Sequence, residues 1–329
     1  MKICLLGEYS GHLDEAMRKI SFHLAGELSK PCELVTLDIR DIRRKRFWSS
    51  LANFDPQIIQ YSHGPSLLSL VVMRMIGLYL RRAKTVIYAT HPGLSILARG
   101  LIPLLKPDLV LTLSYETERM FASRGCKTVF LPAGVDVDKF RPVSTDFRME
   151  LRDKYGLDRD KFIVLHIGSI KKGRNAPLLA EIQGGSNQVI VVGATSTGVE
   201  QDVLQQLRRQ GCLVWAEYFE NIEDIYALSD CYIFPTIKKS GSIELPLSVL
   251  EAMSCNLPVI STRFGGLPRL FEEGDGLFFV DEEMDFSWRL EKIKNGTEVR
   301  NREKVLPYSW EKTGDRLQEI YLELMRGYS

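Results

Sequence analysis

The sequence predicts an α/β fold of two doubly wound parallel sheets, and three observations support this prediction. Short β-branched apolar runs alternate with amphipathic stretches along the whole chain. Strands that are apolar on both faces are typical of a parallel sheet covered by helices on both sides. These runs form two successive series, and 329 residues exceed one ordinary domain. Two doubly wound domains are therefore expected.

The N-terminal series contains six predicted strands, at residues 2–7, 32–37, 57–62, 85–90, 109–114 and 128–133. Apolar residues at helical spacing predict a helix over 14–30. The second series contains six more predicted strands, at residues 162–168, 188–193, 212–219, 231–236, 257–262 and 276–280. Residues 246–255 predict a helix, because Pro246 suits a helix start, and 308–327 predict an amphipathic helix with no strand after it.

The polar segment 141–160 separates the two series. It predicts an N-terminal domain of residues 1–150 and a C-terminal domain of residues 151–308, followed by the closing helix. Open parallel sheets bind ligands beyond the carboxyl ends of their strands. Two such domains that face each other would form one cleft between them. The site residues are therefore expected in the loops that follow the strands.

Composition favours a globular protein, with 45% hydrophobic and 26% charged residues. Residues 1–150 carry 21 Lys and Arg against 15 Asp and Glu, or +6, whereas residues 151–329 carry 22 against 27, or −5. The basic half is the one expected to meet an anionic surface or substrate, although a chance imbalance explains the difference equally well. No nucleic-acid partner is expected.

The six cysteines are scattered without CxxC or metal-ligand spacing, which is typical of reduced thiols in a cytoplasmic protein. The N-terminus reads as a short strand rather than a signal peptide, and no apolar run reaches membrane-spanning length. Two stretches, 41–48 and 78–84, mix cations with aromatic residues, which suits an anionic membrane face. Ordinary solvated loops explain them as well. The expected location is the cytoplasm, with peripheral contact at the inner membrane face left open.

The stretch HIGSIKKGRN (166–175) follows the first strand of the second series. Gly168 allows a tight turn, Lys172 and Arg174 supply positive charge, and Asn175 is expected to cap a helix. Backbone N–H groups, a helix start and cations together predict an anion site, most naturally for phosphate. A solvated basic loop is the alternative. Neither a Walker loop nor a GxGxxG fingerprint is present.

Two carboxylates, Glu244 and Glu251, lie in the otherwise apolar stretch 242–262. A buried carboxylate needs hydrogen-bond donors, either from the protein or from a ligand with hydroxyl groups. Glu251 would lie inside the helix that begins at Pro246, where a carboxylate can accept hydrogen bonds from a ribose diol. Glu244 would lie in the preceding loop. Ordinary surface glutamates remain the alternative.

In the first series, the loop after the first strand contains Gly11, His12 and Asp14. Two further histidines, His63 and His91, also fall at predicted strand ends. A lone histidine is more often structural than catalytic, but three histidines at strand ends indicate a site.

Several stretches together resemble the retaining glycosyltransferases of family 4, which have the two-Rossmann-domain architecture called GT-B. IELPLSVLEAMSCNLPVISTRFGGLP resembles the signature region, and HIGSIKKGRN resembles the donor loop. LPAGVDVDKFRP is similar to the segment that ends the family's N-terminal domain. This similarity gives its DxD pair, Asp136 and Asp138, a structural role that needs no metal ion. YSWEKTGDRLQEIY resembles the closing helix, which in the family crosses back onto the first domain.

The resemblance implies transfer of a sugar from a nucleoside diphosphate donor, UDP- or GDP-linked, to a glycan, lipid-linked or other hydroxyl acceptor. It implies retention of anomeric configuration, no metal and no cofactor. Glu251 is similar to the glutamate that binds the donor ribose, Lys172 to the lysine on the diphosphate, and His91 to the histidine near the sugar. Gly11 resembles a glycine near the donor phosphates.

The catalytic residues expected on this basis are His91, Glu244 and Lys172. The acceptor-side residues expected are His12, His63 and His91. The donor-binding residues expected are Gly11, Gly168, Ser169, Lys172, Arg174, Glu244, Leu245, Leu247, Ser248, Glu251, Gly265, Gly266 and Leu267.

The sequence departs from the family pattern at three places. Six residues rather than seven separate Glu244 from Glu251, Ser169 replaces an arginine, and Arg269 stands where a glutamate is frequent. Other readings remain open: a nucleotide-sugar epimerase of the same fold, or a non-catalytic protein that binds a nucleotide sugar.

Overall fold

A computed structural model describes residues 1–9, 11–13, 15–195, 198–282 and 284–327. The chain folds into two compact units. The first contains Met1–Gly134, Ile243–Leu245 and Trp310–Ser329, and the second contains Val135–Ser242 and Pro246–Ser309. Residues 135–150, which the sequence groups with the first domain, thus belong to the second unit. The reason is local pairing: the Val135 N–H bonds to the Tyr308 carbonyl, and the Phe140 ring packs edge-on against Tyr226.

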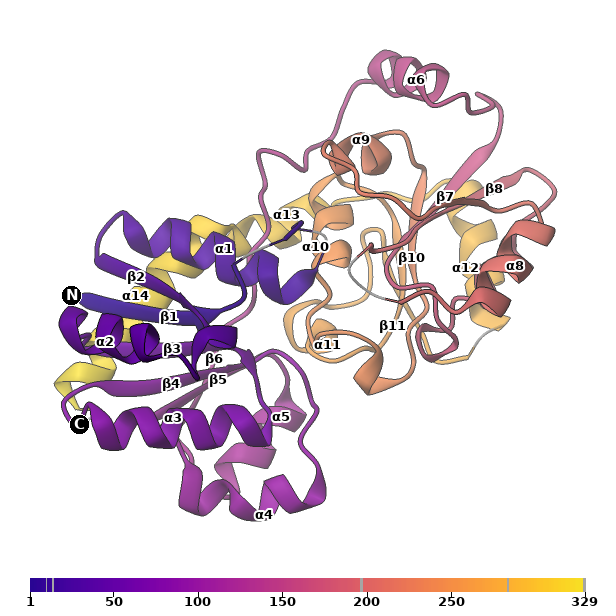
Figure 1. Ribbon diagram of the computed structural model, residues 1–329. Coiled ribbons are helices and arrows are strands. Elements are labelled where there is room, and N and C mark those ends of the chain that lie inside the picture. The colour runs from indigo at the N-terminus through magenta and orange to yellow at the C-terminus, as the bar shows by residue number, and fades with distance from the viewer. Residues whose placement is uncertain (10, 14, 196–197, 283, 328–329) are drawn as a thin grey trace. The chain divides into compact units, whose positions relative to one another are not determined.

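The first unit contains a six-stranded parallel sheet in the order β2-β1-β3-β4-β5-β6 (Figure 1). Its inner strands are buried on both faces, whereas the edge strand β2 is half-exposed, as the continuous apolar runs of the inner strands require. The strands are β1 Lys2–Gly7, β2 Glu33–Asp38, β3 Ile58–Gly64, β4 Lys84–Ala89, β5 Leu109–Thr112 and β6 Thr128–Phe130.

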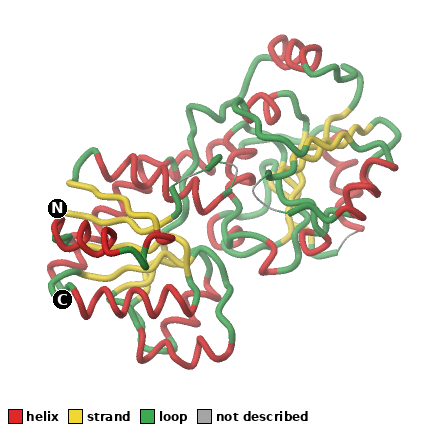
Figure 2. The backbone as a smooth tube through the Cα atoms, in the orientation of Figure 1, coloured by secondary structure: helices red, strands yellow, loops and turns green. Residues whose placement is uncertain are grey.

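Helices cover both faces of this sheet (Figure 2). They are α1 Ala16–Ser29, α2 Lys45–Phe54, α3 Leu67–Tyr79, α4 Ile96–Leu105, α5 Tyr115–Ala122 and α14 Trp310–Arg326, with a 3-10 turn η1 at Ile39–Asp41. The closing helix α14 packs against α1, where the Trp310 ring stacks on His23 with 4.8 Å between ring centroids. Gly314 permits this close approach, because a Cβ there would lie 2.6 Å from the Glu27 Cβ.

The second unit contains another six-stranded parallel sheet, in the order β12-β11-β10-β7-β8-β9. The strands are β7 Phe162–Ile167, β8 Asn187–Val192, β9 Leu213–Trp215, β10 Cys231–Phe234, β11 Val259–Thr262 and β12 Leu277–Val280. All twelve predicted strands of the chain are confirmed, although the predicted strand 212–219 is only three residues long.

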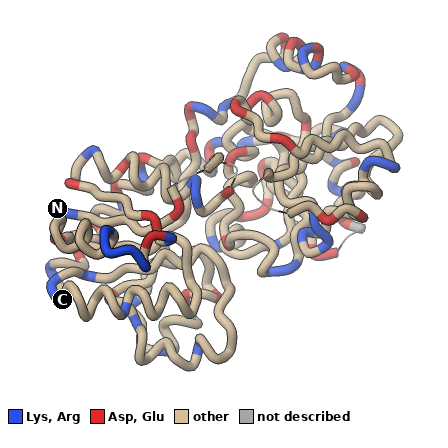
Figure 3. The backbone as a smooth tube through the Cα atoms, viewed as in Figure 1, with Lys and Arg blue, Asp and Glu red and all other residues tan. Residues whose placement is uncertain are grey.

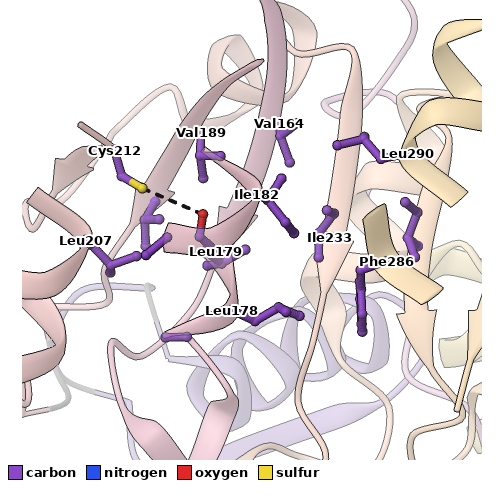
Figure 4. Close-up of a cluster of buried hydrophobic side chains, with 14 of the residues drawn as sticks. Val164, Leu178, Leu179, Ile182, Val189, Leu207, Cys212, Ile233, Phe286 and Leu290 are labelled. Atoms are coloured by element: carbon purple, nitrogen blue, oxygen red, sulfur yellow. Dashed lines mark hydrogen bonds between the residues drawn. The ribbon is translucent and has the colours of Figure 1, made fainter. Parts of the chain in front are cut away.

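The second unit contains the helices α6 Thr145–Lys154, α7 Leu178–Ile182, α8 Gln201–Arg209, α9 Ile222–Ala227, α10 Leu247–Ser254, α11 Leu267–Leu270, α12 Met284–Lys294 and α13 Asn301–Val305. Of these, α7, α8 and α12 contribute side chains to a buried apolar cluster beside β7, β8 and β10 (Figure 4). Three 3-10 turns complete the unit, η2 Lys172–Arg174, η3 Lys239–Gly241 and η4 Leu306–Tyr308. Across the described part of the chain, none of the helices has the length and apolarity needed to cross a membrane.

Candidate functional site

The order in which successive strands join the second sheet reverses between β7 and β10. From this pair, β8 and β9 follow on one side and β11 and β12 on the other. In open α/β sheets such a switch point is where ligands bind, beyond the carboxyl ends of the strands. Three predicted donor-binding stretches follow the neighbouring strands β7, β10 and β11. The structure therefore brings them to one edge of the second sheet.

The basic loop after β7 differs from its predicted form. Asn175 does not begin a helix; it adopts the left-handed conformation (φ 55°), and its N–H bonds to the Lys172 carbonyl to end the 3-10 turn η2. The helix that follows, α7, begins after Pro177 and has only five residues. The predicted cap is therefore wrong, and the charge of Lys172 and Arg174, rather than a helix end, is what this loop offers an anion.

Gly168 lies where the loop leaves β7, and Arg174 folds back over it. A Cβ on Gly168 would lie 2.7 Å from a guanidinium nitrogen of Arg174 and 3.1 Å from His166 Nε2. Ser169, the next residue, is buried. A larger side chain at this position would therefore displace the Arg174 guanidinium.

His166 is a buried residue of this edge that the sequence analysis did not single out. Its Nδ1 lies 2.9 Å from the Ile233 carbonyl, so Nδ1 carries the proton and donates to that oxygen. Complete burial lowers the pKa of His166 to about 4. His166 is therefore neutral at pH 7, with Nε2 beside Gly168 as an acceptor. Its position two residues before the loop glycine was the available signal.

Lys172 is solvent-exposed, and its ammonium pairs with the Asp202 carboxylate of α8 at 2.5 Å. The hydrogen bond that the Lys172 ammonium donates to Asp202 raises the pKa of Lys172. Solvent screens such a pair, so the lysine can exchange this partner for another anion. A second basic turn, η3, lies beside this loop and brings Lys238 and Lys239. Close packing holds the turns together, because a Cβ on Gly241 would lie 2.9 Å from the Gly173 carbonyl.

Glu251 is buried inside α10, as predicted, and its carboxylate accepts a hydrogen bond from the Tyr226 hydroxyl at 2.7 Å. Burial raises the pKa of Tyr226 well above its ordinary value, so the phenol remains a donor. Ser248 lies one turn earlier, and its hydroxyl is 2.7 Å from the Tyr232 hydroxyl of β10. Leu247, which begins the helix, is buried. Two tyrosines thus fix this helix against the site edge.

The turn after β11 contains Gly265, Gly266 and Leu267. Gly265 has φ 53°, a left-handed conformation that favours glycine, and Leu267 begins the short helix α11. The preceding Phe264 ring packs edge-on against Phe234 of β10, with centroids 5.4 Å apart. This contact fixes the turn beside β10, at the same edge as the basic loop.

Glu244 and Leu245 belong to the first unit, not to the unit that carries Glu251. The Glu244 N–H bonds to the Thr90 carbonyl at 2.8 Å, and its carboxylate accepts a hydrogen bond from Thr117 of α5 at 2.5 Å. Both Glu244 and Leu245 are buried. Protein groups therefore pair with Glu244. Its hydrogen bond to Thr90, the residue before His91, places Glu244 beside the start of the His91 loop.

The first sheet has its own switch point between β1 and β3. His63 lies at the end of β3, and a Cβ on Gly7 of β1 would be 3.4 Å from its ring. His91 follows β4 and is half-buried. The three strands are neighbours, so the structure brings the ends that carry these histidines to one edge.

The loop after β1 folds around Arg18 of α1. The Arg18 guanidinium donates to the His12 carbonyl and faces Gly11, whose φ is 102°. His12 itself is exposed. Asp14 lies outside the described residues.

Several buried polar atoms at this edge have no hydrogen-bond partner among the described residues: the Tyr9 hydroxyl, Arg18 Nε and both ring nitrogens of His63. Burial lowers the pKa of His63, which leaves its ring neutral. Sequence reasoning did not single out Tyr9 or Arg18, because a hydrophobic or basic residue near a strand end is common.

The DxD pair has a structural explanation. The Asp136 carboxylate accepts hydrogen bonds from the N–H groups of Asp138 and Lys139, at 3.2 and 2.9 Å. Within the described ranges, no group of three His, Cys, Asp or Glu side chains could hold a metal ion.

Known proteins resemble this chain in sequence. Residues 163–294 match the family described as Glycosyl transferases group 1. The D-inositol 3-phosphate glycosyltransferase of Saccharomonospora viridis is 27% identical over 228 residues, which cover 59% of this chain and 50% of that protein. The sulfoquinovosyl transferase SQD2 of Arabidopsis thaliana is 26% identical over 297 residues, which cover 80% of this chain and 56% of that protein. The chain thus spans about half the length of the curated relatives it matches.

The fold also resembles solved structures. The crystal structure of HepE from Anabaena in complex with UDP and glucose superposes with a TM-score of 0.69 at 15% identity, and covers 99% of this chain and 97% of that one. With two six-stranded parallel sheets flanked by helices, the chain has the GT-B architecture. The predicted fold class is confirmed.

Proposed function

We propose that the protein is a glycosyltransferase that moves a sugar from a nucleoside diphosphate donor to an acceptor hydroxyl. The observation that carries the proposal is Glu251 on α10, at the switch point of the second sheet, beside the basic loop of Lys172 and Arg174. Both lie within the stretch that matches Glycosyl transferases group 1. The complex of the structurally similar HepE with UDP and glucose supports the same class of ligand.

In this proposal the second unit binds the donor. Glu251 accepts hydrogen bonds from the ribose hydroxyls, since a carboxylate has about four lone-pair sites and can accept from several donors at once. Leu247, Ser248 and the Gly265–Leu267 turn line the sugar and phosphate side. Lys172 leaves Asp202 for the diphosphate, and Arg174 lies over Gly168 to contact the same group. The base that we propose is uracil or guanine.

The chemistry needs charge stabilisation at the leaving group. The bond between the sugar C1 and the phosphate oxygen breaks, and its electron pair stays on the diphosphate. The acceptor oxygen bonds to C1 and loses its proton. Cations positioned at the diphosphate stabilise the developing negative charge, so Lys172 and Arg174 take the role that a metal takes in other transferases. Retention of anomeric configuration and metal independence are part of this proposal.

The first unit would bind the acceptor. His12 follows β1, His63 lies at the end of the neighbouring strand β3, and His91 follows β4. Glu244 is fixed near these strand ends through Thr90. Histidine and carboxylate groups can orient a sugar or acceptor hydroxyl. We propose a glycan, a lipid-linked sugar or another hydroxyl compound as the acceptor. A cytoplasmic location suits the six free cysteines, five of which are buried.

The direct test is nucleotide binding followed by turnover. Thermal shift with UDP, GDP, ADP and CMP measures binding, because a ligand at about 100 times its Kd adds roughly 2.7 kcal/mol of stability. The Glu251→Gln variant should bind the preferred diphosphate about 10- to 100-fold more weakly, since hydrogen bonds to a charged group contribute about 1.5–3 kcal/mol. The control is Glu303→Gln, an exposed glutamate of α13 in the same unit.

The outcomes separate the candidate functions. No binding by any diphosphate, or equal binding by both variants, would overturn the donor site. Consumption of a nucleotide sugar without acceptor would identify an epimerase. A donor that binds but stays intact with every acceptor extract would identify a non-catalytic binding protein. Activity that persists in EDTA supports metal independence, and the anomeric coupling of the product by NMR tests retention.

A further inference from the structure

Helix α3 is apolar on its outer as well as its inner face. Its inner side chains, Leu70, Met73 and Ile76, are buried against the first sheet. A surface helix ordinarily presents polar residues on the other side. Here the outer side carries Leu68, which is 61% exposed, together with Met75, Leu78 and Tyr79. The only charged residue within the helix is Arg74.

Helix α4 repeats this pattern beside α3. Ile96 is 89% exposed, Leu97 72% and Leu104 70%. The only charged residue of α4 is Arg99, and its Nε donates to the Leu94 carbonyl. The two helices contact each other along one side of the first unit (Figure 1).

We call the exposed apolar residues of these helices the apolar face: Leu67, Leu68, Met75, Leu78, Tyr79, Ile96, Leu97 and Leu104. Scattered surface hydrophobic residues are normal, but eight on two neighbouring helices indicate a binding surface.

The charge around the apolar face has one sign. Residues 56–107, which include both helices, contain six Lys and Arg and no Asp or Glu. Figure 3 shows blue but no red positions along α3 and α4. Arg81 and Arg82, which follow α3, are exposed. An apolar surface with a positive border matches an anionic bilayer surface, where acyl chains lie beneath phosphate groups.

The end of α3 is also joined to the basic start of α2. The Tyr79 ring packs edge-on against Trp48, with centroids 5.5 Å apart. Exposed Arg43 and Lys45 lie in this segment, whereas Arg44 and Arg46 pair with Asp41. Tryptophan and tyrosine favour the boundary between headgroups and acyl chains. Two basic segments that are about 35 positions apart in the sequence thus lie at one end of α3.

We propose that the apolar face docks on the surface of a bilayer that contains anionic lipid. The side chains of α4, with Leu68 and Met75 of α3, enter the headgroup boundary, and Arg81, Arg82, Arg43 and Lys45 contact lipid phosphates. This inference concerns a surface of the first unit and does not require that the proposed sugar transfer be correct. It names a specific contact face, which the charge of the N-terminal half alone does not.

The test is co-sedimentation of the full chain with vesicles of phosphatidylcholine alone, or of phosphatidylcholine mixed with phosphatidylglycerol. We expect binding to the mixed vesicles and little to phosphatidylcholine. The double variant Leu97→Gln/Leu104→Gln should bind the mixed vesicles at least about ten-fold more weakly, because it removes two leucine side chains that would be buried in the bilayer. The control, Leu322→Gln, changes an exposed leucine of α14 in the same unit and should bind normally.

Arg81→Gln/Arg82→Gln should weaken binding to the mixed vesicles at low salt and have less effect at high salt. Far-UV circular dichroism and thermal melting show that each variant is folded, and these readouts do not depend on enzyme activity. Equal recovery with both vesicle types, or unchanged binding by the α4 variant, would overturn the proposal. So would concentration-dependent dimerisation without vesicles that the α4 variant abolishes, because a second copy would then cover the face.

Discussion

The two units follow the same plan but differ in how the polar groups at their switch points are paired. In the second unit, Glu251 is bonded to Tyr226 and His166 Nδ1 to the Ile233 carbonyl, and among the described residues only the buried His166 Nε2 of these groups lacks a partner. In the first unit, the Tyr9 hydroxyl and both ring nitrogens of His63 are buried without a partner among the described residues. Unpaired buried polar groups cost about 1–3 kcal/mol each, whereas paired ones contribute to stability.

The two switch points therefore differ in whether protein groups already bond their polar side chains. The second one is held in place by the protein itself, which suits a site that must hold a nucleotide in one orientation. The first leaves hydrogen-bonding capacity for water or a ligand. Removal of a tyrosine hydroxyl should therefore change the free energy of unfolding differently in the two units.

The largest expected effect is the pH dependence due to His166. Its pKa is about 4 in the folded protein and about 6.5 in the unfolded chain, so the unfolded state binds the additional proton between these values. Stability should thus fall as the pH decreases from about 6.5 to 4, by about 3 kcal/mol from this residue. Urea unfolding of the wild type and His166→Gln at pH 7 and 4.5 measures it. An identical pH dependence in the two proteins would contradict this role.

Burial also lowers the pKa of His63, so its contribution has the same sign. It too should destabilise the fold in acid, since the unfolded state again binds the proton more readily. The ring nitrogens of His63 have no hydrogen-bond partner among the residues that the structure describes. His63→Gln should therefore make the free energy of unfolding less sensitive to acid without removing a hydrogen bond, whereas His166→Gln also removes the bond to Ile233.

The same substitution made in both units gives the next largest effect. Tyr226→Phe removes a donor from the buried Glu251 carboxylate and should destabilise the protein by about 1.5–3 kcal/mol. Tyr9→Phe removes a hydroxyl that has no partner in the described part of the chain, so it should be neutral or slightly stabilising. Chemical denaturation of both variants at pH 7 is the measurement. Equal losses would show that the Tyr9 hydroxyl is bonded, for example by ordered water.

A smaller effect concerns the packing of the first unit. Gly314→Ala places a Cβ against Glu27 where α14 meets α1, and overpacking of this kind costs about 1–3 kcal/mol. The intrinsic helix preference of alanine returns about 1 kcal/mol, so the net loss is about 1 kcal/mol. The matched control is Gly26→Ala in α1, where a Cβ meets nothing within 4 Å and should stabilise. A melting temperature that rises for both variants would refute the close contact.

The smallest effect tests the exchange of Lys172 between Asp202 and a ligand. Asp202→Asn should leave the fold stability nearly unchanged, because this pair is exposed and screened. The freed lysine should strengthen binding of a nucleoside diphosphate about two- to three-fold, since it no longer has a competing partner. Isothermal titration calorimetry at low salt measures this gain. Weaker binding would mean that Asp202 positions Lys172 rather than competes with the ligand.

Local patterns in the sequence were enough to predict the fold. Each of the twelve strands was marked by a short apolar run, and Pro246 marked the start of α10, because strand and helix periodicity depends on neighbouring residues. The same patterns placed Glu251 inside that helix and the basic loop after β7. These features need no knowledge of distant contacts.

The tertiary structure decided what the local patterns could not. Thr117 and Glu244, which are 127 residues apart, become hydrogen-bond partners, and Tyr226 becomes the partner of Glu251. Contacts with Tyr308 and Tyr226 assign residues 135–150 to the second unit. Asn175 ends a turn where its sequence suggested a helix cap. The physical reason is that hydrogen-bond partners and burial depend on which distant segments meet, whereas strand and helix formation is largely specified by residues close together in the chain.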